Sequence, residues 1–116
     1  MLPQHLRLRK SADFVTVLRR GRKVARPTLI LYARTSDHPR FGLVVGKRVG
    51  DATQRNTIKR RLRHRAMALI DDAQPLDVVV RALPGAALSK AALVDDFSSA
   101  WEEASNLERT RERVST

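Results

Sequence analysis

Basic side chains recur at helical spacing in the segment VGDATQRNTIKRRLRHRA, residues 49–66, which holds six of the chain's 23 Lys and Arg residues. Arg55, Lys59 and Arg63 follow one another at intervals of four, so a helix would carry them on one side. Like charges at this spacing repel each other in an isolated helix, and ordered phosphate groups would offset that repulsion. The residue types and their spacing therefore predict a surface that binds a polyanion, with nucleic acid as the first candidate and an anionic membrane surface as the second.

The same helix, predicted from about Asp51 or Ala52 to Ile70, divides into two faces. At about 100° per residue, an apolar stripe suited to packing on a sheet lies about 110° from a basic set. A merely solvated face usually mixes both signs of charge, whereas residues 52–70 contain no acid. We call the second set the basic face. The stripe consists of Ile58, Leu62, Ala66 and Leu69, and the basic face consists of Arg55, Asn56, Lys59, Arg60 and Arg63.

Residues suited to protein-side catalysis do not converge in the sequence. His5, His38 and His64 lack the spacing that puts two metal ligands on one helix face. The carboxylate pairs 71–72 and 95–96 are adjacent, and adjacent helical residues point about 100° apart. We therefore predict no catalytic residue and no metal site on the protein.

Length and charge predict a single domain with a basic first half. The chain has 116 residues, 42% of them hydrophobic, which is enough for one modest core, so residues 1–116 are interpreted as one globular domain that binds a polyanion. Residues 1–65 carry a net charge of +15 and residues 66–116 a net charge of −4. The chain contains no Cys, and no run is apolar enough for a signal peptide or a membrane span. We expect a soluble, cytoplasmic monomer without a membrane partner.

The elements that must position the basic face follow from periodicity and turn residues. The pattern predicts an α+β or α/β sandwich of helices on a small sheet. The strands 28–34 and 41–47 are expected to form an antiparallel hairpin, with a small strand possible before Pro27. A flexible basic arm over about 1–8 and a polar, frayed tail over about 106–116 complete the chain. The remaining predicted elements are a helix over 11–20 with Ser11 as its N-cap, a strand over 76–83 and a helix over 89–105.

Two aromatic side chains outside the expected main core have two interpretations. Phe14 and Tyr32 could be ordinary core residues, or they could form a shallow apolar platform on which unpaired bases stack. Strand alternation places Ile30 and Tyr32 on one face and Leu29 and Leu31 on the other. Phe97 and Trp101, in the acidic half, are predicted to be core.

The segment FGLVVGKRVGDATQRNTIKRRLRH resembles the signature of the bacterial ribonuclease P protein component. In that family a GLxVxKKxG-type strand end leads into an RNxxKRxxR helix. Here Gly42 to Gly50 match the strand end, and Arg55, Asn56, Lys59, Arg60 and Arg63 match the helix. LRKSADFVTVLRRGRK resembles the family's first helix and LDVVVRAL its last strand, so the similarity covers roughly residues 6–100.

The resemblance implies an α-β-β-β-α-β-α order and a central, mostly antiparallel sheet in a small two-layer sandwich with an unusual left-handed βαβ crossover. It also implies a function: the protein subunit of an endoribonuclease whose catalytic RNA removes the 5′ leader of precursor tRNA with Mg²⁺ held mainly by RNA. The basic face would contact that RNA, and Lys47 and Arg48 would contact it from the loop before the helix. Phe14, Leu18, Ile30 and Tyr32 match the cleft that grips the single-stranded leader.

The sequence departs from the family pattern at four positions and leaves two rival functions open. A general or ribosome-associated RNA-binding protein would bind structured RNAs without preferring a leader, and a protein-only nuclease would cleave without an RNA subunit. Leu18, in place of a frequent aromatic residue, reduces the stacking platform. The other departures are Thr53 for a usual aliphatic residue, Gln54 for a common basic residue and His64 for a usual acid or amide.

Overall fold

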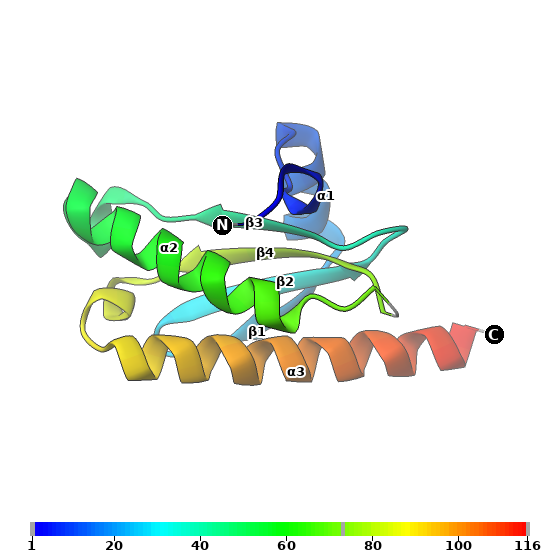
Figure 1. Cartoon of the computed structure of the whole chain (residues 1–116). Coiled ribbons are helices and arrows are strands. Elements are labelled where there is room, and N and C mark those ends of the chain that lie inside the picture. Colours follow the sequence, from blue (N-terminus) through cyan, green and yellow to red (C-terminus); the bar gives the residue numbers. More distant parts are fainter. Residues whose placement is uncertain (1, 73, 116) are drawn as a thin grey trace.

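The computed structural model describes residues 2–72 and 74–115, and its helices and strands follow the order α-β-β-β-α-β-α that the resemblance implied (Figure 1). Predicted and observed bounds of the helix at 11–20 are identical, although the N-cap is Lys10 rather than Ser11. The elements are η1 Gln4–Leu6, α1 Ser11–Arg20, β1 Arg22–Ala25, β2 Leu29–Thr35, β3 Arg40–Val44, η2 Lys47–Val49, α2 Ala52–Leu69, β4 Leu76–Ala82, η3 Pro84–Ala87 and α3 Lys90–Ser115.

The four strands form one mixed sheet in the order β1-β2-β4-β3. β1 with β2 and β2 with β4 are antiparallel, whereas β3 and β4 are parallel and are connected through α2. The predicted hairpin of the second and third strands is therefore wrong, because β4 lies between them. The short loop after Thr35 passes the start of β4, where the Ser36 N–H donates to the Pro75 carbonyl over 3.1 Å. The run Val78–Val80 is buried on both faces of the sheet, as a central strand requires.

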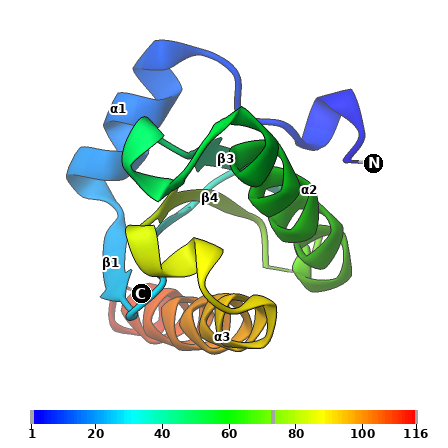
Figure 2. The ribbon, with the colours of Figure 1, turned by 90° about the vertical axis from the view of Figure 1, so that its left-hand side faces the viewer.

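The main core fills the space between the sheet and the pair α2 and α3. Figure 2 shows α1 on the opposite side of the sheet from α3. Phe41 of β3 packs against Phe97 and Trp101 of α3, with ring centroids 5.7 and 6.0 Å away, so the prediction that these two aromatic residues are core is confirmed. A smaller cluster of Leu8, Val17 and Val79 connects α1 to the other face of the sheet.

The N-terminal segment differs from the flexible arm expected over about residues 1–8. Leu2 is buried in the main core and Leu8 in the smaller cluster. The Leu8 N–H donates to the Phe41 carbonyl over 2.9 Å, so the segment covers the otherwise free edge of β3. The apolar side chains among the basic ones are what fix this segment to the sheet; residue 1 lies outside the described residues.

Helix α3 is longer than the sequence predicted, because it continues to Ser115 instead of ending near residue 105. Leu93, Phe97, Ala100, Trp101, Ala104 and Glu108 follow one another along the inward side of α3, and all are buried. Glu108 is only 2% exposed; its carboxylate accepts from the Thr35 hydroxyl over 3.0 Å and lies 3.8 Å from Arg22. Glu108, a polar side chain, thus occupies an inward position at which the sequence pattern would require an apolar residue. The helix therefore stays packed on the sheet for another turn.

Candidate nucleic-acid interface

A capping box fixes the start of α2 and therefore the first basic residues. The Gln54 N–H donates to the Asp51 carboxylate over 2.8 Å, and the Asp51 N–H donates to the Gln54 side-chain oxygen over 2.9 Å. This reciprocal pair satisfies two N–H groups that a helix start leaves without partners. Gln54, a departure from the family's common basic residue, is thus explained by helix capping. Arg55 and Asn56 follow directly in the first turn.

The two predicted faces of α2 are confirmed as a buried and an accessible face. Ile58, Leu62 and Ala66 are buried, and Leu69 packs against the same core. Asn56, Arg60 and Arg63 are exposed, whereas Arg55 and Lys59 are half-buried. Within residues 2–72 and 74–110, whose side chains the structure describes, no carboxylate forms an ion pair with a cation of this face. Its charge is therefore available to an external anion.

One flank of α2, the side that bears Arg65, is turned toward α3. Arg65 Nε donates to the Ser98 hydroxyl of α3 over 2.9 Å, which fixes the rotation of α2 about its axis. Lys59 and Arg63 consequently lie on the flank away from α3. Arg60 lies on the crest of α2, the exposed ridge between these two flanks. It lines a groove with α3, so the structure separates it from the rest of the basic face.

The sheet face that bears α1 carries two rows of side chains, which we call the open face. In one row, strand register aligns Lys23, Tyr32, Val79 and Gly42 across all four strands. In the next row it aligns Ile30 with Arg81 and Val44. Paired residues project to the same side of a sheet. An apolar surface with cations along its length is thus present on the side where Ile30 and Tyr32 were predicted.

Phe14 reaches this face from α1 because Gly42 leaves room for its ring. A Cβ atom on Gly42 would lie 2.5 Å from the Phe14 ring. Phe14 and Tyr32 both pack on the small cluster around Val79, yet both are only half-buried. Each ring therefore has one part in the small core and another part accessible, and the stacking of unpaired bases on the accessible part stays a prediction. Leu18 is 37% exposed on α1 and is not part of this cluster.

A hollow of about 410 Å³ connects the open face to the turn before α2. It brings Ile30 together with Lys47 and Arg48, which the sequence predicted separately as cleft and loop residues. Arg81 also lines it and was missed, because a single Arg in an apolar strand gives no periodic signal. The complete lining is Ile30, Val44, Gly46, Lys47, Arg48, Val49, Arg81, Ala82, Leu83 and Pro84.

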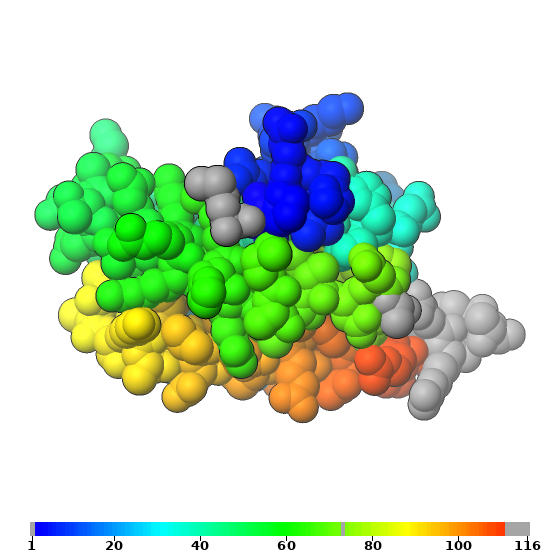
Figure 3. Space-filling view, in the orientation of Figure 1, coloured from blue at the N-terminus to red at the C-terminus, as the bar shows by residue number. Residues whose placement is uncertain are grey.

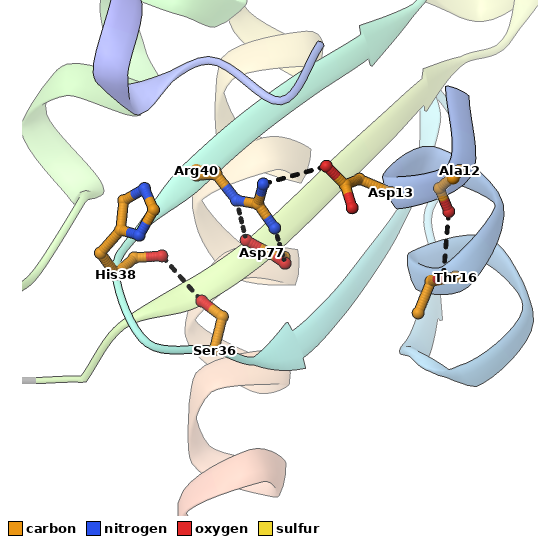
Figure 4. A network of polar contacts seen from close by, with 7 residues as sticks. All are labelled: Ala12, Asp13, Thr16, Ser36, His38, Arg40 and Asp77. Atoms are coloured by element: carbon orange, nitrogen blue, oxygen red, sulfur yellow. Dashed lines mark hydrogen bonds and ion pairs between the residues drawn. The ribbon is translucent and has the colours of Figure 1, made fainter. Parts of the chain in front are cut away.

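An ion-pair network ties α1 to the sheet beside the open face (Figure 4). Arg40 of β3 donates two hydrogen bonds to the Asp77 carboxylate of β4, at 2.9 and 2.8 Å. Its remaining terminal nitrogen donates to Asp13 of α1 over 3.1 Å. The hydrogen bonds to Asp77 raise the pKa of Arg40 above its ordinary value, so the guanidinium is charged throughout the working pH range. The network fixes α1, and with it Phe14, relative to the strands.

Metal-ligating side chains do not gather in the described part of the chain: no group of three His, Asp or Glu residues there could hold an ion. His38 lies in the loop before β3, far along the chain from His64 on α2. Among the described helices, none has the length and apolar character needed to cross a membrane.

Comparisons with known proteins agree with this geometry. The family model for ribonuclease P matches residues 2–105. The ribonuclease P protein component of Rhodococcus erythropolis is 44% identical over 103 residues, which cover 79% of this chain and 82% of that protein. That of Acidothermus cellulolyticus is 50% identical over 94 residues, which cover 75% of this chain and 77% of that one.

The fold is also that of solved structures in this family. A mutant RNase P protein from Staphylococcus aureus superposes with a TM-score of 0.80 at 27% identity, covering 87% of this chain and 89% of that one. The RNase P protein from Thermotoga maritima gives a TM-score of 0.59 at 28% identity, covering 89% and 96%. The α+β fold of this chain therefore matches that of solved bacterial RNase P proteins. With a family match over nearly all described elements, this chain belongs to the family of bacterial ribonuclease P protein components.

Proposed function

We propose that this chain binds the catalytic RNA of ribonuclease P and the 5′ leader of precursor tRNA at the same time. The basic face of α2, with Lys47 and Arg48 before it, would contact phosphates of the catalytic RNA. Phe14, Leu18, Ile30 and Tyr32 would contact the leader. The protein would thus hold the substrate beside the RNA that removes the leader by endonucleolytic hydrolysis.

The observation that carries the proposal is the hollow that joins the two predicted sites. Ile30 of the open face and the pair Lys47 and Arg48 line the same concave surface, and Arg48 is three residues before Asp51, the N-cap of α2. A single-stranded RNA leader lying over Ile30 would therefore run past Lys47 and Arg48 toward the catalytic RNA bound at α2. Arg81, opposite Ile30 in the register, adds a further phosphate contact from the sheet itself.

The proposed physical role is to lower the repulsion between two polyanions. Cations placed between the catalytic RNA and the leader release counterions from both, which strengthens binding and makes it depend on salt. The Mg²⁺ that hydrolysis requires would be held mainly by RNA. The chain's own residues would bind and orient the two RNAs and neutralise part of their charge.

A cleavage assay tests the proposal. Precursor tRNA, a bacterial ribonuclease P RNA and this protein are combined at a Mg²⁺ concentration too low for the RNA alone. The proposal predicts cleavage at the 5′ end of the mature tRNA only when both RNA and protein are present. Cleavage by the protein alone would favour a protein-only nuclease, and no stimulation would favour a general or ribosome-associated RNA-binding role.

A further inference from the structure

A second cationic surface lies on the flank of α2 that faces α3. The two helices run side by side, as the green and the yellow to orange surfaces in Figure 3 show. A groove of about 490 Å³ lies between them. Its lining consists of Arg60, Arg61, His64, Arg65, Lys90 and Val94. Among these described residues none is acidic, although the half of the chain that contains α3 is acidic overall.

One guanidinium in this groove is already oriented for an anion. Arg65 uses Nε to donate to Ser98, and its two terminal nitrogens have no hydrogen bond to any described residue. A guanidinium held in this way presents a fork that matches two phosphate oxygens. Because its rotamer is fixed before binding, less conformational entropy is lost when the contact forms.

The cations of the groove repel one another in the free protein. Arg61 and Arg65 are four residues apart on α2, and Lys90 approaches from the first turn of α3. The first turn of a helix also carries the positive end of its dipole. No carboxylate of the described residues pairs with any of the three. An external anion would offset this repulsion, as it would on the other flank.

We infer that the groove between α2 and α3 binds a second stretch of RNA backbone, separate from the stretch on Lys59 and Arg63. The inference rests on the proposed function, since it assigns a further segment of the same partner RNA. Helix α2 would then lie between two RNA segments, with Arg60 on the crest within reach of both. An RNA is favoured over an acidic protein because the groove is continuous, through Arg60, with the basic face.

The test compares three double variants of the full chain in binding to a bacterial ribonuclease P RNA over a range of KCl concentrations. Arg61→Gln with Lys90→Gln removes two groove cations, and Lys59→Gln with Arg63→Gln removes two cations of the basic face. Arg26→Gln with Arg109→Gln removes the same charge elsewhere, where Arg26 pairs with Glu103 and Arg109 with Gln74. Urea unfolding checks that each variant is folded.

The expected result is that the slope of log K against log salt falls by about two for the groove variant and for the basic-face variant. The control variant should keep the parent slope. A normal slope for the groove variant with a reduced slope for the basic-face variant would overturn the inference and leave the proposed function standing. Normal slopes for both variants would overturn both.

A second measurement identifies the RNA segments directly. Because the chain contains no Cys, a single introduced cysteine can carry an iron chelate that cleaves nearby RNA. Ala91→Cys places it next to Lys90 of the groove and Ala52→Cys at the start of α2, before the basic face, both at exposed positions. The inference predicts cuts in two different segments. Cuts from position 91 no stronger than from Glu103→Cys, on α3 beside Arg26, would contradict it.

Discussion

Arg40 and Asp77 form a two-bonded ion pair across the parallel strands β3 and β4, with nitrogen to oxygen distances of 2.9 and 2.8 Å. Asp77 is 8% exposed, so its carboxylate depends on this partner. Since Arg40 also reaches Asp13, one side chain joins the parallel strand pair to α1. The stability of the sheet and the position of α1 above it are therefore coupled.

Replacing Arg40 by Ala should destabilise the protein by about 2 kcal/mol, because a buried carboxylate loses its partner. The stabilisation by the ion pair would be lost only where Arg40 loses its proton, and the raised pKa of Arg40 places that above the ordinary working pH. The loss of stability in the variant should therefore be the same at pH 6 and pH 8. Urea unfolding measures it. Arg48→Ala, at an exposed position, should change stability by less than about 0.5 kcal/mol; an equal loss in both variants would show that the pair is not what matters.

Replacing Gly42 by Ala should displace the Phe14 ring, since the added Cβ would lie 2.5 Å from it. We expect about a tenfold loss of affinity for precursor tRNA, because a displaced aromatic ring stacks poorly on a base. Affinity for mature tRNA should not change. Thr110→Ala, at an exposed position near the end of α3 and outside the open face and the hollow, is the control. The leader assignment of Phe14 fails if the Gly42 variant and this control bind alike.

Replacing Arg60 by Ala should weaken binding of the catalytic RNA and lower the salt slope of log K by about one, the value for one lost phosphate contact. The free protein should lose no stability, because Arg60 is exposed and unpaired, and relief of repulsion within α2 favours the variant by a few tenths of a kcal/mol. Filter binding and urea unfolding measure the two quantities. An unchanged slope would remove Arg60 from the phosphate contacts.

Replacing Glu108 by Ala should destabilise the protein by about 1–2 kcal/mol, because the Thr35 hydroxyl loses its acceptor and a buried volume is left empty. Hydrogen exchange should increase first in the part of α3 after Ala104. Glu102→Ala, exposed on the same helix, provides the comparison and should leave stability nearly unchanged. If α3 after residue 105 exchanged freely in the parent protein, the frayed tail expected from the sequence would be correct after all.

The sequence predicted local elements and the division of α2 well, because both depend on short-range periodicity. Strand pairing was beyond it: a short loop after Thr35 favours a hairpin, and only the double-sided burial of Val79 forces β4 between the two strands. Glu108 and Leu2 were missed for a similar reason, since each is fixed by a distant partner rather than by its neighbours in sequence. The coarse order of the elements also followed from the pattern, and the resemblance implied the full α-β-β-β-α-β-α order with its first strand.

The candidate site likewise contains residues that the sequence could predict and residues that it could not. The basic face could be predicted because its residues are spaced at one helix turn, whereas Arg81 becomes visible only through its register with Ile30. Gln54 seemed a weakening of the family pattern until its side chain was found to cap α2. The groove cations Arg65 and Lys90 come from two elements, so no single stretch of sequence could have grouped them.

The most direct test of the central claim is the affinity of the protein, assembled with a bacterial ribonuclease P RNA, for precursor tRNA and for mature tRNA. The two substrates differ only in the 5′ leader, which the open face is proposed to bind. We predict tighter binding of the precursor, and a smaller difference when Tyr32 is replaced by Ala. Equal affinity for the two substrates would contradict the account.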